Sequence, residues 1–286
     1  MRRSVTKCSP RISITRTEPT PFRLAGAFQF DMMSSRGRRY RVFLHEPSAK
    51  PPPDGFPVLY LLDGNATFAT AVETAAMQTR RPAATGVPPC VIVGIGSPVD
   101  TPLDLDRRRF DFTPEDANGA DQLQGGGATW FSDFIETDLK PTVEAMVPID
   151  RNRQALFGHS FGGLFVLLSL FSHLERFQSY IAASPSIWWR ERSILRHEAH
   201  FIETVRKNVT GTRLLLTVGG LEQSAHHEDV TSQLTMVEEA AALGERLRLQ
   251  ASNRLKVSFA KLADETHVSV IPAAISRSIR FAWSNP

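Results

Sequence analysis

The sequence is poor in cysteine, in long apolar runs and in excess charge of one sign. Its 286 residues include two cysteines, Cys8 and Cys90, far apart in a chain without secretory features, so we expect reduced thiols and a cytoplasmic location. The apolar run 164–171 is much shorter than the roughly 18 residues of a membrane span. No apolar run follows the basic residues near the N-terminus, so a secretory signal is not expected.

The charge balance argues against a nucleic-acid partner. The 33 Lys and Arg residues against 30 Asp and Glu give a net charge of +3, and the basic residues are spread along the chain. The cluster His226–Asp229 contains metal-ligand residue types, but adjacent side chains diverge and no H-E-x-x-H pattern is present. We therefore expect a solvated loop there, and neither a metal nor another cofactor.

Hydrophobic patterning predicts one α/β domain over residues 1–286, with 1–21 as a flexible tail or an added strand. Residues 39–45 alternate apolar and polar side chains, whereas 57–62 and 90–95 are continuous apolar runs typical of buried parallel strands. Further strands are expected at 28–30, 154–157, 178–183, 213–218 and 256–262, and helices at 67–78, 129–147 with an interruption at Pro141, 164–171, 236–247 and 272–283. This alternation indicates a mostly parallel sheet with helices on both faces.

Residues Gly158-His159-Ser160-Phe161-Gly162 match the nucleophile-elbow pattern G-x-S-x-G. In this pattern a serine occupies a strained turn between a strand and a helix, and both glycines avoid clashes that a Cβ would make. An apolar strand precedes the motif and an apolar helix follows it, as the turn requires. The alternative is a glycine-rich helix start with a capping serine. We predict that Ser160 is the nucleophile of an α/β-hydrolase.

His267 and Glu222 are the candidates for the other catalytic groups. A serine hydroxyl needs an imidazole to accept its proton, and in this fold the histidine comes last in the chain. Of eight histidines, only His267 follows the final predicted strand, and the alternative is an exposed loop histidine. Glu222 follows the penultimate strand, where the orienting acid is expected, with Glu228 and Asp229 as alternatives.

An oxyanion hole requires two backbone N–H groups aimed at one oxygen. One comes from the residue after the nucleophile, Phe161, and the other from the loop after the strand at 57–62. In that loop we predict Asn65 as the second donor, with Gly64 as its alternative.

The chain carries four distinctive stretches: Leu59–Asn65, Arg107–Pro114, Phe157–Gly163 and Ala183–Trp189. Together they resemble the putative-esterase branch of the α/β hydrolases, and within it the trilactone hydrolases that open enterobactin, salmochelin or bacillibactin. The resemblance extends from about residue 40 to the end of the chain. It implies ester hydrolysis in a catecholate siderophore by a serine and a histidine. Some members have no functional acid, which leaves a dyad open as the alternative to a triad with Glu222.

The resemblance also directs attention to side chains suited to an anionic aromatic ligand. A ferric tris-catecholate is trianionic and its rings stack on guanidinium planes, so Arg107 and Arg108 are candidate substrate-binding residues, with a solvated basic loop as the alternative. Trp188 and Trp189 follow a predicted strand, where they are placed to line an aromatic pocket, with at least one packing in the core. Residues 98–129 are expected to form a long loop over the site.

These features predict a serine esterase that works through an acyl-enzyme on a small-molecule ester, and the resemblance favours a catecholate siderophore trilactone. A general carboxylesterase or thioesterase for small acyl substrates would use the same catalytic residues and differ in its pocket. A ferric-siderophore binding protein without turnover is a third hypothesis, which the intact serine and histidine disfavour.

Overall fold

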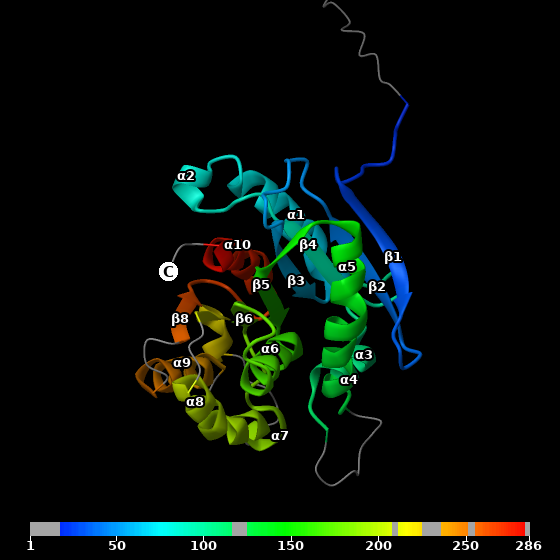
Figure 1. Ribbon diagram of the computed structural model, residues 1–286. Helices are drawn as coiled ribbons and strands as arrows, with labels where there is room; N and C mark the ends of the chain where they lie inside the picture. Colours follow the sequence, from blue (N-terminus) through cyan, green and yellow to red (C-terminus); the bar gives the residue numbers. More distant parts are fainter. Residues whose placement is uncertain (1–17, 116–124, 208–210, 225–235, 251–254, 284–286) are drawn as a thin grey trace, which may run out of the picture.

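A mostly parallel sheet forms the centre of the protein in a computed structural model that describes residues 18–115, 125–207, 211–224, 236–250 and 255–283 (Figure 1). Its eight strands within these ranges follow the order β1-β2-β4-β3-β5-β6-β7-β8. They are β1 (Ala27–Met33), β2 (Arg39–His45), β3 (Phe56–Leu62), β4 (Val91–Gly96), β5 (Ile149–His159), β6 (Ser179–Ala183), β7 (Thr212–Gly219) and β8 (Leu255–Leu262). Strand β2 is antiparallel to both β1 and β4, and the other adjacent pairs are parallel. The predicted α/β-hydrolase sheet is confirmed.

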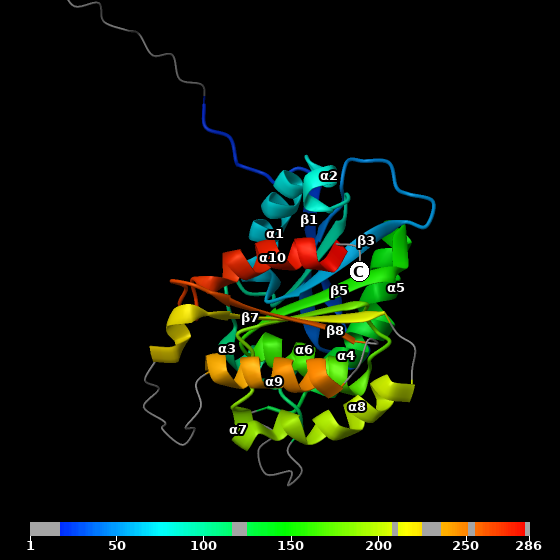
Figure 2. The same ribbon diagram turned by 90° about the vertical axis from the view of Figure 1, so that its left-hand side faces the viewer.

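Helices cover both faces of this sheet (Figure 2). Helices α1 (Gly64–Gln78) and α10 (Val270–Trp283) pack on one face, where Phe68 and Ile275 belong to one apolar cluster. Helices α6 (Phe161–Ser172) and α9 (Met236–Gln250) pack on the other, where Leu167 and Leu243 belong to a second cluster. The remaining helices are α2 (Pro82–Thr85), α3 (Leu105–Phe112), α4 (Ala128–Asp133), α5 (Lys140–Met146), α7 (Trp189–Arg192) and α8 (Glu198–Lys207).

The burial of the strands follows the pattern of their residues. All seven residues of β3 are buried, because helices cover both of its faces. Strand β2 alternates, with Tyr40, Val42 and Leu44 buried and the intervening side chains more exposed. Its buried side contacts the α4–α5 region, where the Tyr40 ring stacks on the Phe134 ring with 4.1 Å between the ring centroids.

Two predictions about the middle of the chain need correction. Residues 98–129, expected to be a long loop, contain helix α3, whose N-cap Asp104 accepts a hydrogen bond from the Arg107 N–H at 3.2 Å. The helix predicted around Pro141 is continuous through α4 and α5, and it widens to a π-helical turn over Phe134–Leu139. Proline lacks the N–H that would close the normal helical bond, so the widened turn just before it takes the place of a break.

The ends of the chain and its thiols are described only in part. Residues 1–17, which include most of the predicted tail and Cys8, lie outside the described residues. Cys90 is buried and free. Across the described ranges, every helix is too short or too polar to cross a membrane.

The turn between β5 and α6 is held in a strained conformation by close backbone contacts. Ser160 has φ +60° and ψ −118°, backbone angles that residues other than glycine rarely adopt. A Cβ on Gly158 would lie 2.3 Å from the carbonyl oxygen of Gly162, so this glycine is required as predicted. A Cβ on Gly162 would meet nothing closer than 3.5 Å, and the expected clash there is wrong. The next residue, Gly163, is the tighter one, at 2.9 Å from the Ala183 oxygen.

Replacing Gly158 by alanine should destabilise the protein. The new Cβ forces the backbone of the turn to shift, at a cost of about 1–3 kcal/mol or more. Gly162→Ala is the matched control, because its Cβ fits and alanine favours a helix over glycine by about 1 kcal/mol. Urea unfolding should give a lower midpoint for Gly158→Ala and an unchanged or higher one for Gly162→Ala. Equal midpoints for the two variants would contradict the close contact.

Candidate active site

The three predicted catalytic side chains meet at the carboxyl edge of the sheet. Ser160 follows β5, Glu222 lies in a short 3-10 helix after β7, and His267 lies between β8 and α10. Parallel strands end at one edge, so residues far apart in sequence become neighbours. The Nε2 atom of His267 is 3.1 Å from the Ser160 Oγ, and its Nδ1 atom is 3.0 Å from Glu222 Oε2. The side chains form a continuous hydrogen-bonded chain.

Glu222 is held as an ionised carboxylate. Burial alone would raise its pKa, but hydrogen bonds from His267, from the Ser184 hydroxyl and from the Gly219 N–H outweigh burial and leave the pKa below its usual value. The Ser184 Oγ and the Gly219 nitrogen both lie 2.6 Å from Oε1. An ionised carboxylate only accepts hydrogen bonds, so Nδ1 of His267 carries the proton. Nε2 is then free to accept the Ser160 proton.

Two serines at the site, Ser184 and Ser186, were not predicted. Ser184 has φ +41°, and its N–H donates to the Thr217 carbonyl at 2.7 Å while its hydroxyl reaches Glu222. Ser186 lies with its Oγ 3.4 Å from the Ser160 Oγ, and its N–H donates to the Ser160 carbonyl. Both follow β6, which lies between β5 and β7. That strand order is the signal that points to them, and it is not visible in the sequence alone.

His159, the residue before the nucleophile, is buried against the general-base candidate. Its ring centroid lies 4.6 Å from that of His267. Burial, reinforced by the nearby charges of His267 and Arg108, lowers the pKa of His159 to about 3. The side chain therefore stays neutral at physiological pH.

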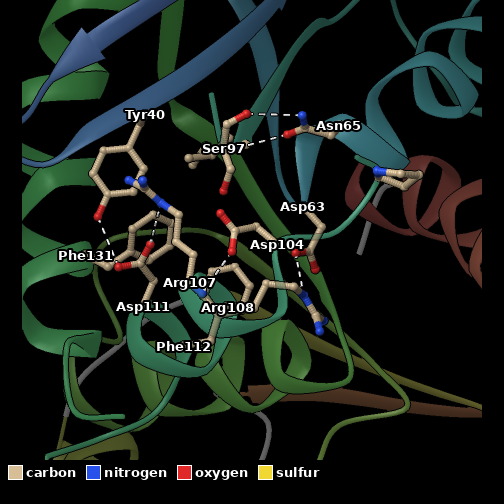
Figure 3. Close-up of a pocket in the computed structure, with 13 residues that line it drawn as sticks. Tyr40, Asp63, Asn65, Ser97, Asp104, Arg107, Arg108, Asp111, Phe112 and Phe131 are labelled. Carbon is tan, nitrogen blue, oxygen red and sulfur yellow. Dashed lines mark hydrogen bonds and ion pairs between the residues drawn. The ribbon is translucent and has the colours of Figure 1, made fainter. Parts of the chain in front are cut away.

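The oxyanion-hole candidates sit at two neighbouring helix starts. Phe161 is the first residue of α6, and Gly64 and Asn65 are the first two of α1. The N–H groups of a first helical turn have no partner within the helix and favour developing negative charge. The Asn65 side chain is committed elsewhere, because it exchanges hydrogen bonds with the backbone of Ser97 (Figure 3). It also donates to the Val99 carbonyl. Only its backbone N–H is left to serve an oxyanion.

The two arginines predicted to bind substrate both lie on α3 and both have acidic partners. The Arg108 Nε is 2.6 Å from Asp63 Oδ1, and the Arg108 side chain is 9% exposed. The Arg107 guanidinium lies over the Tyr40 ring, and its Nε is 3.3 Å from Asp111. Neither forms a solvated basic loop, and a role for either in binding substrate stays a prediction from the sequence.

Trp188 and Trp189 lie beside Phe161, the residue that follows the nucleophile, and their predicted contact with substrate stays a prediction. The Phe161 ring lies 4.8 Å from Trp189 and 6.2 Å from Trp188, measured between centroids. Trp189 packs against the core, whereas Trp188 is 39% exposed. Together the three rings form an aromatic wall next to Ser160.

The alternative acids and the cluster predicted to be a solvated loop fall in a segment that is not described. Glu228, Asp229 and the whole cluster His226–Asp229 lie outside the described residues. Within the described part of the chain, the His, Cys, Asp and Glu side chains form no group of three suited to a metal ion. Glu222 is therefore the acid that the described geometry connects to His267.

Replacing Glu222 by glutamine should lower kcat for a nitrophenyl ester by roughly 10² to 10⁴-fold, because the carboxylate that orients His267 and stabilises its charged form is lost. Asp264→Asn is the matched control, since Asp264 is an exposed carboxylate in the same loop as His267. Steady-state kinetics on both variants decides the point. A loss below about threefold in Glu222→Gln would favour a Ser-His dyad.

Comparison with known proteins agrees with this geometry. Residues 34–267 match the family described as "Putative esterase". The ferri-bacillibactin esterase BesA of Bacillus subtilis is 44% identical over 261 residues, which cover 88% of each chain. A siderophore triacetylfusarinine C esterase of Aspergillus fumigatus is 35% identical over 282 residues, covering 91% of this chain and 94% of that protein.

The crystal structure of the BES protein from Bacillus cereus superposes with a TM-score of 0.84 at 37% identity, covering 94% of this chain and 100% of that one. The agreement therefore extends from the sequence to the whole fold. The chain belongs to the putative-esterase family, and it is a serine hydrolase that acts on carboxylic ester bonds.

Proposed function

We propose that the protein hydrolyses the ester bonds of a catecholate siderophore trilactone, with Ser160 as nucleophile, His267 as general base and Glu222 as orienting acid. The 3.1 Å contact between Ser160 and His267 supports the first step, in which the serine oxygen attacks the ester carbonyl and its proton moves to Nε2. The backbone N–H groups of Phe161 and Asn65 then stabilise the oxyanion.

The remaining steps use the same residues, with His267 acting first as an acid and then again as a base. His267 donates its proton to the departing alcohol, and Ser160 is left as an acyl ester. Water then attacks this ester with His267 again as base. Each turnover opens one ester of the trilactone and adds one water, so repeated turnovers release linear fragments.

The observation that carries the substrate assignment is the aromatic wall beside Ser160. Catechol rings stack on aromatic faces, and the exposed Trp188 ring is available for such a contact. The guanidinium of Arg190 lies 5.9 Å from the Trp189 ring centroid and extends the wall with a cation. A trianionic ferric catecholate complements both features.

The relatives support the class of substrate without selecting one member. One is named for ferri-bacillibactin and the other for triacetylfusarinine C, so this family accepts differing siderophores. The aromatic wall favours the catecholate, and the small-molecule ester is the one partner proposed. A cytoplasmic location stays a prediction from the sequence.

Product analysis tests this function. Ferric and iron-free catecholate trilactones are incubated with the enzyme beside nitrophenyl acetate, and the products are identified by mass spectrometry. We expect linear fragments whose summed mass exceeds that of the trilactone by one water for each opened ester. Turnover of nitrophenyl acetate with both trilactones intact would assign the protein to general carboxylesterases or thioesterases instead.

Trp188→Ala should raise KM for the ferric trilactone by about tenfold, because loss of one stacked aromatic contact is worth about 1–1.5 kcal/mol. The same variant should turn over nitrophenyl acetate within about threefold of wild type, since this substrate carries no catechol ring to stack on Trp188. Trp130→Ala is the matched control, because Trp130 on α4 is similarly exposed, at 43%, and contacts Phe110 and Arg36. Equal changes on both substrates would remove Trp188 from substrate binding.

A further inference from the structure

Arg108 joins two turns that carry the candidate oxyanion donors. Its Nε is 2.6 Å from Asp63 Oδ1, at the end of β3, and its Nη2 donates to the His159 carbonyl at 3.3 Å, at the end of β5. Figure 3 shows the guanidinium of Arg108 reaching from α3 to Asp63. Both charged side chains are buried, at 9% and 7% exposure. One side chain from α3 thus bridges the Asp63 carboxylate at the end of β3 and the His159 carbonyl at the end of β5.

Each bridged residue lies within two residues of a candidate donor in the sequence. Asp63 directly precedes Gly64 and stands two residues before Asn65, and His159 stands two residues before Phe161. An oxyanion hole works only when both N–H groups lie about 2.7–3.1 Å from the same oxygen. The separation of the two turns therefore decides whether the hole is formed.

The turn after β3 needs an external support. Asp63 has φ +55°, a left-handed conformation that is costly for a residue other than glycine. A Cβ on Gly64 would lie 2.8 Å from the Gly94 backbone, so the turn is also packed tightly against β4. Strained backbone persists where its surroundings fix it, and the Asp63 carboxylate is fixed by Arg108.

We propose that Arg108 is a positioning residue for the oxyanion hole, which sets the distance between the starts of α1 and α6 by bridging Asp63 and the His159 carbonyl. The planar guanidinium donates in two fixed directions, so it acts as a rigid spacer. The inference rests on the proposed role of Ser160 as nucleophile. It does not depend on which ester is the natural substrate.

Two variants separate this role from simple stability. Arg108→Lys keeps the charge beside Asp63 but lacks the rigid fork that also reaches His159. The double variant Asp63→Asn with Arg108→Gln leaves no unpaired charge in the buried site, and it decides the question if the lysine variant does not fold. Arg246→Gln is the matched control, because it removes a 2.8 Å ion pair between Arg246 on α9 and Glu198 on α8.

Three quantities are measured. They are KM on nitrophenyl acetate, kcat on the same substrate per active site counted by titration, and the Ki of phenylboronic acid. The boronate forms a tetrahedral adduct with a reactive serine and so reports on the hole itself. We expect kcat to fall by about tenfold to a hundredfold with KM changed less than about threefold, and Ki to rise by the same factor as kcat/KM falls. Arg246→Gln should leave kcat/KM and the boronate Ki unchanged.

Three results would overturn the proposal. The first is a folded Arg108 variant with kcat per active site within about threefold of wild type. The second is a loss of titratable sites with unchanged kcat at those that remain, which would make Arg108 structural only. The third is a fall in kcat with unchanged boronate affinity. Failure of the proposed function is distinct, because wild type would then leave trilactones intact while still hydrolysing nitrophenyl acetate.

Discussion

The common carboxyl edge of β3 and of β5 to β8 is the constraint that places every group of the site. Ser160, Ser184, Glu222 and His267 each follow one of these strands, although more than 100 residues separate the first from the last. Adjacent parallel strands bring their ends to one line, so short loops suffice to join the nucleophile, base and acid. The reaction requires side chains from several loops, and the sheet supplies their relative positions.

Backbone strain is concentrated at the same edge. Asp63, Ser160 and Ser184 follow β3, β5 and β6, and all three have positive φ, at 55°, 60° and 41°. Each is held by a specific partner: Arg108 for Asp63, the Ala183 carbonyl for the Ser160 N–H, and the Thr217 carbonyl for the Ser184 N–H. Such conformations cost of order 1–3 kcal/mol each and persist where neighbouring groups fix them. The site is therefore preorganised before a substrate arrives.

The sequence predicts the sheet and the Ser160-His267-Glu222 geometry because both depend on local patterns and chain order. Apolar runs mark β3 and β4, and the positions of His267 and Glu222 after the last two strands are enough to find them. The burial of Arg108 could not be predicted, because a charged residue in a polar stretch is expected to be exposed, and its buried partner lies 45 residues away in the chain.

Other features depend on which strands lie side by side. The roles of Ser184 and Ser186 become visible only when β6 is placed between β5 and β7. Helix α3 escaped prediction because its sequence, LDRRRFDF, is dominated by charge and carries little apolar periodicity. Tertiary contacts, chiefly Arg108 with Asp63 and Asp111 with the Tyr40 hydroxyl, fix this helix beside the site.

The central claim is that Ser160 is the nucleophile and that His267 activates it. Peptide mapping after labelling with a fluorophosphonate tests this most directly, because the reagent forms a stable covalent bond only with an activated serine. We expect one adduct per chain, on the peptide that contains Ser160, and much slower labelling when His267 is replaced by alanine. An adduct on Ser184 or Ser186, or labelling of Ser160 at an unchanged rate without His267, would contradict the account.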